Sequence, residues 1–209
     1  MTSKPWILFD IGGVFALAND GVWQRRFSQG LRARSGLDDD EFSARIDAAE
    51  LPRVDVESGG ESEYWRRLAE ALGFDVATRN DIQAEFWNAY CGVANEELLA
   101  FARALPAHVG RAALSNSMDG AREQEERRFG LSCVVDPICY SHEIGALKPQ
   151  PAAYAAALAR MGANAADVLF IDDHQLALDG AEAAGIRSVL HTDNATTIAA
   201  IEVFLAAYA

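Results

Sequence analysis

The sequence predicts an α/β protein, in which a parallel sheet covered by helices is interrupted after its first strand by a long helical insertion. Three observations predict this fold. An apolar run at residues 7–9 stops at Asp10, as a strand buried on both faces does. Residues from about 19 to 90 show helical periodicity and no good strand candidate. From about residue 96, candidate strands alternate with candidate helices, which indicates crossover units and a parallel sheet.

The insertion is predicted to contain amphipathic helices, because apolar residues recur there every four positions. The two clearest series are Tyr64, Leu68, Leu72 and Ile82, Phe86, Tyr90. Helix starts are predicted where an Asp, Ser or Thr stands three positions before an acidic residue, as in a capping box. These positions are Asp38, Ser58 and Thr78.

The second half of the chain provides most of the elements of the sheet. The expected helices span residues 96–105, 120–129, 151–161, 176–184 and 197–207, and the expected strands span 111–114, 133–135, 139–141, 168–171 and 187–190. The first strand is therefore separated from the others by the helical block. We interpret residues 1–15 and 93–209 as an α/β core domain and residues 16–92 as a helical domain inserted into it.

The composition excludes some functions. Lys and Arg number 18 against 31 Asp and Glu, for a net charge of −13, which argues against a nucleic-acid or anionic-membrane partner because either needs a basic surface. The three cysteines show no CxxC spacing, so neither a disulfide framework nor a zinc site is predicted. No apolar run approaches membrane-spanning length. We expect a cytoplasmic protein, monomeric or homodimeric.

Polar residues follow several of the predicted strands. Parallel strands deliver their last residues to one edge of the sheet, so we expect these side chains to meet there. They are Asp10, Ser115 with Asn116, and the pair Asp172 and Asp173, together with Lys148 before a predicted helix. Three clustered carboxylates repel one another unless a cation neutralises them. Oxygen ligands of this kind suit Mg²⁺.

In these residues the chain resembles the haloacid dehalogenase superfamily, in the branch with a helical cap inserted after the first motif. The four motifs occur in order as Phe9-Asp-Ile-Gly-Gly-Val14, Leu114-Ser-Asn116, Glu143-Ile-Gly-Ala-Leu-Lys-Pro-Gln-Pro151 and Phe170-Ile-Asp-Asp173. The resemblance covers the whole chain, although the cap is matched only by position and helical character. It implies a Rossmann-like parallel sheet with a small cap domain.

The resemblance also implies a role for each motif residue. Asp10 is the expected nucleophile, which would form an aspartyl-phosphate. Ser115 would hydrogen-bond a phosphoryl oxygen and Lys148 would offset negative charge. Asn116 would help to place the substrate. The expected ligands of Mg²⁺ are Asp10, the carbonyl of Gly12, Asp172 and Asp173. Taken singly, each of these side chains has an ordinary structural interpretation as a turn, surface or N-cap residue.

Position 12 departs from the family pattern. Phosphatases of this family usually carry a second aspartate there, which protonates the leaving group and later activates water, whereas this chain has Gly12. General acid–base catalysis typically contributes ~10²–10⁴-fold. We therefore expect slow turnover of alkyl phosphates and faster turnover of aryl or acyl phosphates. His142 and His174 flank the third and fourth motifs and are candidates for a replacement acid or base.

The function that we expect is Mg²⁺-dependent hydrolysis of a small phosphorylated metabolite through an aspartyl-phosphate. One alternative is a 2-haloacid dehalogenase, in which Asp10 attacks carbon and no metal is needed; the pair Asp172 and Asp173 favours a metal instead. A second alternative is a binding or regulatory protein of the same fold that turns over little substrate because position 12 lacks an acid.

Overall fold

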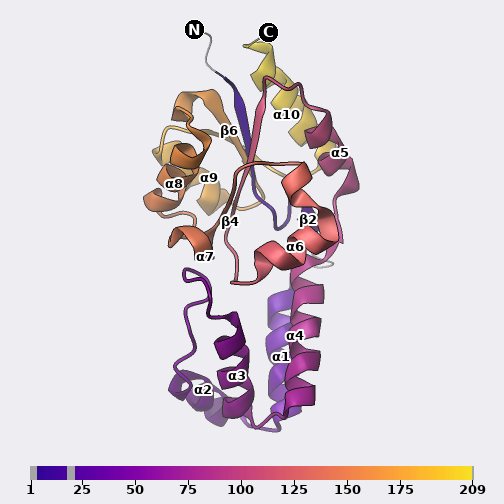
Figure 1. Cartoon of the computed structure of the whole chain (residues 1–209), viewed down its shortest axis with the longest axis vertical. Helices are drawn as coiled ribbons and strands as arrows, with labels where there is room; N and C mark the ends of the chain where they lie inside the picture. The colour runs from indigo at the N-terminus through magenta and orange to yellow at the C-terminus, as the bar shows by residue number, and fades with distance from the viewer. Residues whose placement is uncertain (1–3, 18–21, 209) are drawn as a thin grey trace.

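A five-stranded parallel sheet forms the centre of the core in the computed structural model, which describes residues 4–17 and 22–208 (Figure 1). Its strands are β1 (Trp6–Phe9), β4 (Gly110–Ser115), β5 (Ile138–Tyr140), β6 (Val168–Asp172) and β7 (Arg187–Leu190). They are arranged in the order β5-β4-β1-β6-β7, and all neighbours run parallel. This arrangement confirms the predicted α/β fold and places β1 at the middle of the sheet.

The helices of the core cover both faces of the sheet. They are α5 (Glu96–Ala104), α6 (Ala121–Phe129), α7 (Ser141–Ile144), α8 (Pro151–Met161), α9 (Gln175–Ala183) and α10 (Asn194–Ala206), with 3₁₀ turns at Leu131–Cys133 and Ala165–Asp167. Successive residues of β1 point to opposite faces. Ile7 and Phe9 belong to the apolar cluster that includes residues of α5 and α10, and Leu8 belongs to the cluster that includes residues of α8 and α9.

One of the predicted strands is wrong. Residues 133–135 do not form a strand, because Leu131–Cys133 form a 3₁₀ turn directly after α6. Gly130 ends α6 in the left-handed conformation, and Leu131, Val134 and Val135 are buried against the core. A short apolar run can be a strand or a buried turn, and its periodicity does not distinguish the two.

The segment between β1 and α5 contains the four helices that we call the cap. These are α1 (Trp23–Ser35), α2 (Asp39–Ala48), α3 (Glu61–Leu72) and α4 (Val76–Cys91). The chain enters and leaves the cap through two short antiparallel strands, β2 (Ala16–Leu17) and β3 (Val93–Ala94). The helical pattern expected from about residue 19 lies partly outside the described residues. The cap lies beyond the carboxyl ends of the strands (Figure 1).

Only one of the three predicted helix caps in this segment is confirmed. The Asp38 carboxylate accepts a hydrogen bond from the backbone N–H of Glu41 at the start of α2. The prediction for Ser58 is wrong because α3 begins after Gly60. The prediction for Thr78 is wrong because Asp75 caps α4 and accepts from the N–H of Thr78. In both cases another residue, two or three positions away, occupies the N-cap position: Gly60 for α3 and Asp75 for α4.

The loop between α2 and α3 attaches the cap to the core. The carbonyl of Val54 accepts a hydrogen bond of 2.7 Å from the N–H of Asp119, which lies after β4. The hydroxyl of Ser58 donates to the carbonyl of His142 at 2.9 Å, in the short helix α7 after β5. The cap therefore contacts the loops at the carboxyl end of the sheet. None of the helices in the described ranges combines the length and apolar character needed to cross a bilayer.

Candidate active site

Three of the predicted site residues lie at the ends of adjacent strands. Asp10 directly follows β1, and Ser115 and Asp172 are the last residues of β4 and β6. Since β1 lies between β4 and β6, these ends are adjacent. The N–H of Asp10 donates to the carbonyl of Ile171 at 2.8 Å, which continues the pairing of β1 with β6. All three side chains are buried.

Lys148 lies between two carboxylates. Its Nζ is 2.8 Å from Oδ1 of Asp10 and 2.6 Å from Oδ2 of Asp172, and its side chain is only 5 % exposed. The loop that carries this lysine is held by Asn116, whose Oδ1 accepts from the N–H of Lys148 at 2.7 Å and whose Nδ2 donates to its carbonyl at 2.9 Å. Asn116 thus positions Lys148, and the substrate contact that the resemblance implied for Asn116 stays a prediction.

The pKa values of this group reflect burial and mutual charge. Burial raises the pKa of Asp10, the positive charge of Lys148 opposes that shift, and the charge of Asp172 adds to it. Burial alone would lower the pKa of Lys148, but the two carboxylates outweigh it and raise that pKa. The ammonium is therefore held in the charged form. When both carboxylates are ionised, one buried cation leaves this group with a net negative charge, which favours a further cation at the site.

The two oxygens of Asp10 have different surroundings. Oδ1 accepts from the N–H of Ile11 at 2.7 Å and contacts Lys148, whereas no residue in the described ranges hydrogen-bonds Oδ2. Asp172 uses both oxygens, Oδ2 for Lys148 and Oδ1 for the N–H of His174 at 2.8 Å. The oxygen that remains available to attack a substrate is therefore Oδ2 of Asp10.

The carboxylate of Asp173 lies against the loop that follows β1. A Cβ atom built on Gly13 would lie 2.1 Å from Oδ2 of Asp173, and Gly13 has a φ of +77°. Only glycine fits this position, both for its backbone conformation and for the close approach. Among the described residues, no donor occupies the carbonyl of Gly12. The loop that follows β1 therefore packs closely against the Asp173 carboxylate at Gly13.

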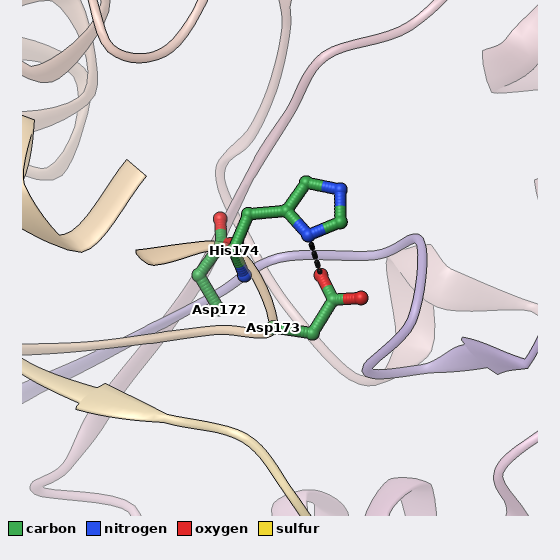
Figure 2. Close-up of side chains that lie close together, drawn as sticks. All are labelled: Asp172, Asp173 and His174. Carbon is green, nitrogen blue, oxygen red and sulfur yellow. Dashed lines mark hydrogen bonds and ion pairs between the residues drawn. The ribbon is translucent and has the colours of Figure 1, made fainter. Parts of the chain in front are cut away.

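Asp172, Asp173 and His174 have ligand-type atoms within 4.8 Å of one another. Figure 2 shows that the carboxylate of Asp173 points away from Asp172 and toward the imidazole of His174, whose Nδ1 is 3.5 Å from Oδ1 of Asp173. The side chain of His174 is 80 % exposed. Carboxylate and carbonyl oxygens suit Mg²⁺. The carboxylates of Asp10, Asp172 and Asp173, which follow the neighbouring strands β1 and β6, are ligands of the type that fits this ion.

The second candidate histidine, His142, is occupied elsewhere. Its ring is buried and stacks on Tyr140, and its Nδ1 is 2.8 Å from the hydroxyl of Ser117. Burial lowers the pKa of His142. These contacts favour a structural role for His142. Its Nδ1 is occupied by the hydroxyl of Ser117, which is not one of the predicted site residues.

Two residues near the site were not among the sequence candidates. Burial raises the pKa of Tyr90, in the last turn of α4, well above its usual value, and the charges of Glu125, Cys91 and Asp10 add to the shift. Glu125, in α6, is buried and accepts a hydrogen bond of 2.7 Å from the hydroxyl of Tyr140. Burial raises the pKa of Glu125 to about 8, and the charge of Asp10 adds to the shift. The helical periodicity of the sequence places Tyr90 on a helix but does not indicate that the charge of Asp10 acts on this side chain.

Comparison with known proteins identifies the family. The family model of haloacid dehalogenase-like hydrolases matches residues 5–185. The chain therefore belongs to the haloacid dehalogenase-like hydrolases and is an enzyme of that class. A search of curated proteins found no match to the sequence.

Solved structures of the same family resemble the chain over most of its length. A haloacid dehalogenase family enzyme from Bacteroides thetaiotaomicron, in complex with magnesium and inorganic phosphate, is 18 % identical, with a TM-score of 0.72 over 94 % of this chain and 99 % of that one. A family hydrolase from Porphyromonas gingivalis is 22 % identical, with a TM-score of 0.67 over 98 % of both chains. The L-2-haloacid dehalogenase from Xanthobacter autotrophicus, with chloropropionic acid covalently bound, is 19 % identical, with a TM-score of 0.59 over 98 % of this chain and 88 % of that one. At these identities the likeness shows the shared fold.

Proposed function

We propose that this hydrolase is a Mg²⁺-dependent phosphatase that acts on a small phosphorylated metabolite. The observation that carries the proposal is the arrangement around Lys148. Its ammonium lies between Asp10 and Asp172 and leaves Oδ2 of Asp10 without a hydrogen-bond partner among the described residues. A carboxylate nucleophile with one free oxygen, held beside a buried cation, is suited to attack an anionic phosphoryl group.

Asp10, the Gly12 carbonyl, Asp172 and Asp173 would hold the Mg²⁺ ion. When bound, this ion neutralises phosphate charge and orients the phosphoryl group. The net negative charge of the residues around Lys148 and the oxygen donors beside Gly13 support this assignment. The magnesium and phosphate complex of the Bacteroides relative is consistent with it.

The reaction has two steps. Oδ2 of Asp10 forms a bond to phosphorus while the bond from phosphorus to the leaving oxygen breaks, and the leaving oxygen takes a proton from water. Ser115 donates a hydrogen bond to a phosphoryl oxygen, and Lys148 stabilises the charge on Asp10 and on the phosphoryl group. In the second step water attacks phosphorus, the bond to Asp10 breaks, and inorganic phosphate leaves. The cap excludes bulk water and selects the substrate.

The same fold also hosts dehalogenases, as the Xanthobacter relative shows for its own chain. In this chain, Asp172 and Asp173 stand at the end of β6, next to the strand that Asp10 follows, and such a set of oxygen donors favours a metal-dependent reaction. The attack of a carboxylate on carbon, with release of halide, needs no metal. Metal dependence therefore separates the two reactions in an assay.

The test is hydrolysis of p-nitrophenyl phosphate and glycerol phosphate with Mg²⁺, after chelation, and after Mg²⁺ is restored. Wild type should release phosphate only with Mg²⁺, and Asp10→Asn should abolish the activity. The matched control is Asp40→Asn, at an exposed aspartate in α2, and it should retain full activity. Release of halide from a 2-haloacid without metal, in place of phosphate release, would establish the dehalogenase alternative. If wild type and Asp10→Asn are equally inactive on both substrate classes, the chain is a binding protein.

A further inference from the structure

The loop between α2 and α3, residues 49–60, is hydrogen-bonded to two segments of the core, and we call it the cap loop. It extends from the cap toward α7 (Figure 1). The carbonyl of Val54 accepts from the N–H of Asp119 at 2.7 Å. The carbonyl of the next residue, Asp55, accepts from the hydroxyl of Ser141 at 2.7 Å. The cap loop is therefore bound to the segments that follow β4 and β5.

Ser141 lies next to the end of β4. It directly follows β5, whose last residue, Tyr140, is paired in register with Ser115 of β4. Because these strands are parallel neighbours, the residues that follow them lie side by side. Ser141 is completely buried, so its hydroxyl needs hydrogen-bond partners from the protein itself.

The hydroxyl of Ser141 makes two hydrogen bonds in opposite directions. It donates to the carbonyl of Asp55 in the cap loop, and it accepts from the N–H of Ser117 at 2.8 Å. A hydroxyl carries one proton and two lone pairs, so it can do both at once. Two bonds connected in this way polarise and strengthen one another. One buried hydroxyl thus connects the cap loop with the backbone of the loop after β4.

That loop carries groups of the candidate active site. Ser117 stands two residues after Ser115 and one residue after Asn116. Asn116 in turn holds the backbone of Lys148 through hydrogen bonds of 2.7 and 2.9 Å. A displacement of the Ser117 backbone therefore shifts Asn116, and with it the loop of Lys148. Ser141 lies between the cap loop and the residues that would contact the phosphoryl group.

We propose that Ser141 is a positioning residue, which holds Ser115 and Lys148 in place for phosphoryl transfer when the cap loop is seated on the core. The inference rests on the proposed phosphatase function. When the cap loop withdraws, the carbonyl of Ser117, at 3.1 Å, is the acceptor that remains for the Ser141 hydroxyl. The hydroxyl then bonds only to the loop after β4, and the connection to the cap is lost. Seating of the cap loop and affinity for phosphate are therefore coupled.

The experiment compares Ser141→Ala with Ser58→Ala on p-nitrophenyl phosphate and glycerol phosphate with Mg²⁺. Ser58 is the matched control, because its hydroxyl also joins the cap loop to the core, at 2.9 Å, but through the carbonyl of His142. For Ser141→Ala we expect kcat/KM to fall about 10-fold, because two buried hydrogen bonds are lost. The fall should be equal for both substrates, since they share the phosphoryl group. Ser58→Ala should match wild type.

The inhibition constant of inorganic phosphate separates positioning from stability. Partial unfolding of a variant lowers the concentration of active enzyme and leaves this constant unchanged. If Ser141 positions the residues that contact the phosphoryl group, the constant should rise about 10-fold in Ser141→Ala and stay at the wild-type value in Ser58→Ala.

A second measurement uses the wild-type protein and does not depend on the stability of a variant. Coupling between two sites is reciprocal, so bound phosphate must strengthen the seating of the cap loop. The amide of Asp119 reports on that seating, because it donates to the carbonyl of Val54. Inorganic phosphate with Mg²⁺ should slow hydrogen exchange at this amide. Exchange at the amide of Phe42, which is hydrogen-bonded within the cap to the carbonyl of Asp38, should not change.

Four results would each overturn the inference while the phosphatase function stands: equal kcat/KM for Ser141→Ala and Ser58→Ala, a loss confined to one substrate, an unchanged inhibition constant of phosphate in Ser141→Ala, or exchange at Asp119 that phosphate does not slow. Absence of any Asp10-dependent phosphate release from wild type would overturn both proposals.

Discussion

Replacing Gly12 by aspartate should restore a general acid to the site. A Cβ atom at Gly12 meets no atom within 4 Å, the residue is exposed, and its backbone is outside the left-handed region that requires glycine. Loss of backbone freedom in the unfolded chain should offset the added charge, with a net change of about 0.5 kcal/mol or less in unfolding free energy. The neighbouring position differs, because a Cβ at Gly13 would overlap Asp173.

The gain in rate should depend on the leaving group. A positioned acid contributes ~10²–10⁴-fold, which lowers the barrier by about 3–5 kcal/mol. An alkoxide leaving group needs a proton in the transition state, whereas a nitrophenolate does not. We therefore expect kcat/KM for glycerol phosphate to rise by at least ~10²-fold and kcat/KM for p-nitrophenyl phosphate to change little.

The assay measures phosphate release from both substrates by wild type, Gly12→Asp and Gly12→Asn. The asparagine variant has the same size and hydrogen-bonding reach but no transferable proton, so it isolates the effect of the acid. Equal glycerol phosphate activity in the two variants, with unchanged Mg²⁺ affinity and melting temperature, would refute the assignment of position 12 to the leaving group.

Two further predictions concern buried charge. Lys148→Met should abolish phosphate release and lower the unfolding free energy by about 3–5 kcal/mol, because Asp10 and Asp172 lose the cation between them. Chemical denaturation measures the unfolding free energy. An unchanged denaturation midpoint would contradict the prediction. Glu125→Gln should flatten the pH dependence of stability. Because the pKa of Glu125 is raised to about 8 in the folded protein, its contribution is complete below pH ~4.3 and is lost as pH rises through about 8. The variant should therefore gain about 3–5 kcal/mol on wild type between pH 5 and 9, as measured by denaturation at each pH; parallel profiles would contradict the burial of this carboxyl. The titratable groups that act on Glu125 are Tyr140, Asp10, Arg122, Tyr90 and Cys91.

Several features of the site could be predicted from the sequence, since they follow from local rules. The apolar run before Asp10 predicts a central strand, and the parallel topology predicts that Asp10, Ser115 and Asp172 meet at one edge. The structure places these residues at the ends of β1, β4 and β6. Lys148 joins them through its loop.

Local sequence signals did not predict the start of α3, because residues from other parts of the chain make the hydrogen bonds there. Ser58 has the spacing of a capping box, but its hydroxyl donates to the carbonyl of His142, which lies 84 positions later in the chain. The start of α3 is instead served by the Asp119 carboxylate, which accepts from the N–H of Glu61 at 2.9 Å. A contact between the cap and the core thus decides where a helix of the cap begins, and no local pattern encodes that contact.

The sequence by itself determined the order of the motifs, the sheet and the chemistry of its edge, because these depend on strand periodicity and on residue type. Only the tertiary structure decided which other side chains enter the site. Asn116 hydrogen-bonds the backbone of Lys148, which lies 32 positions later in the chain, and Glu125 of α6 is buried close enough to Asp10 for the two charges to interact. Such contacts depend on how each helix and each loop packs on the core. Those are set by the sum of many long-range interactions, each too small to be read from a local pattern.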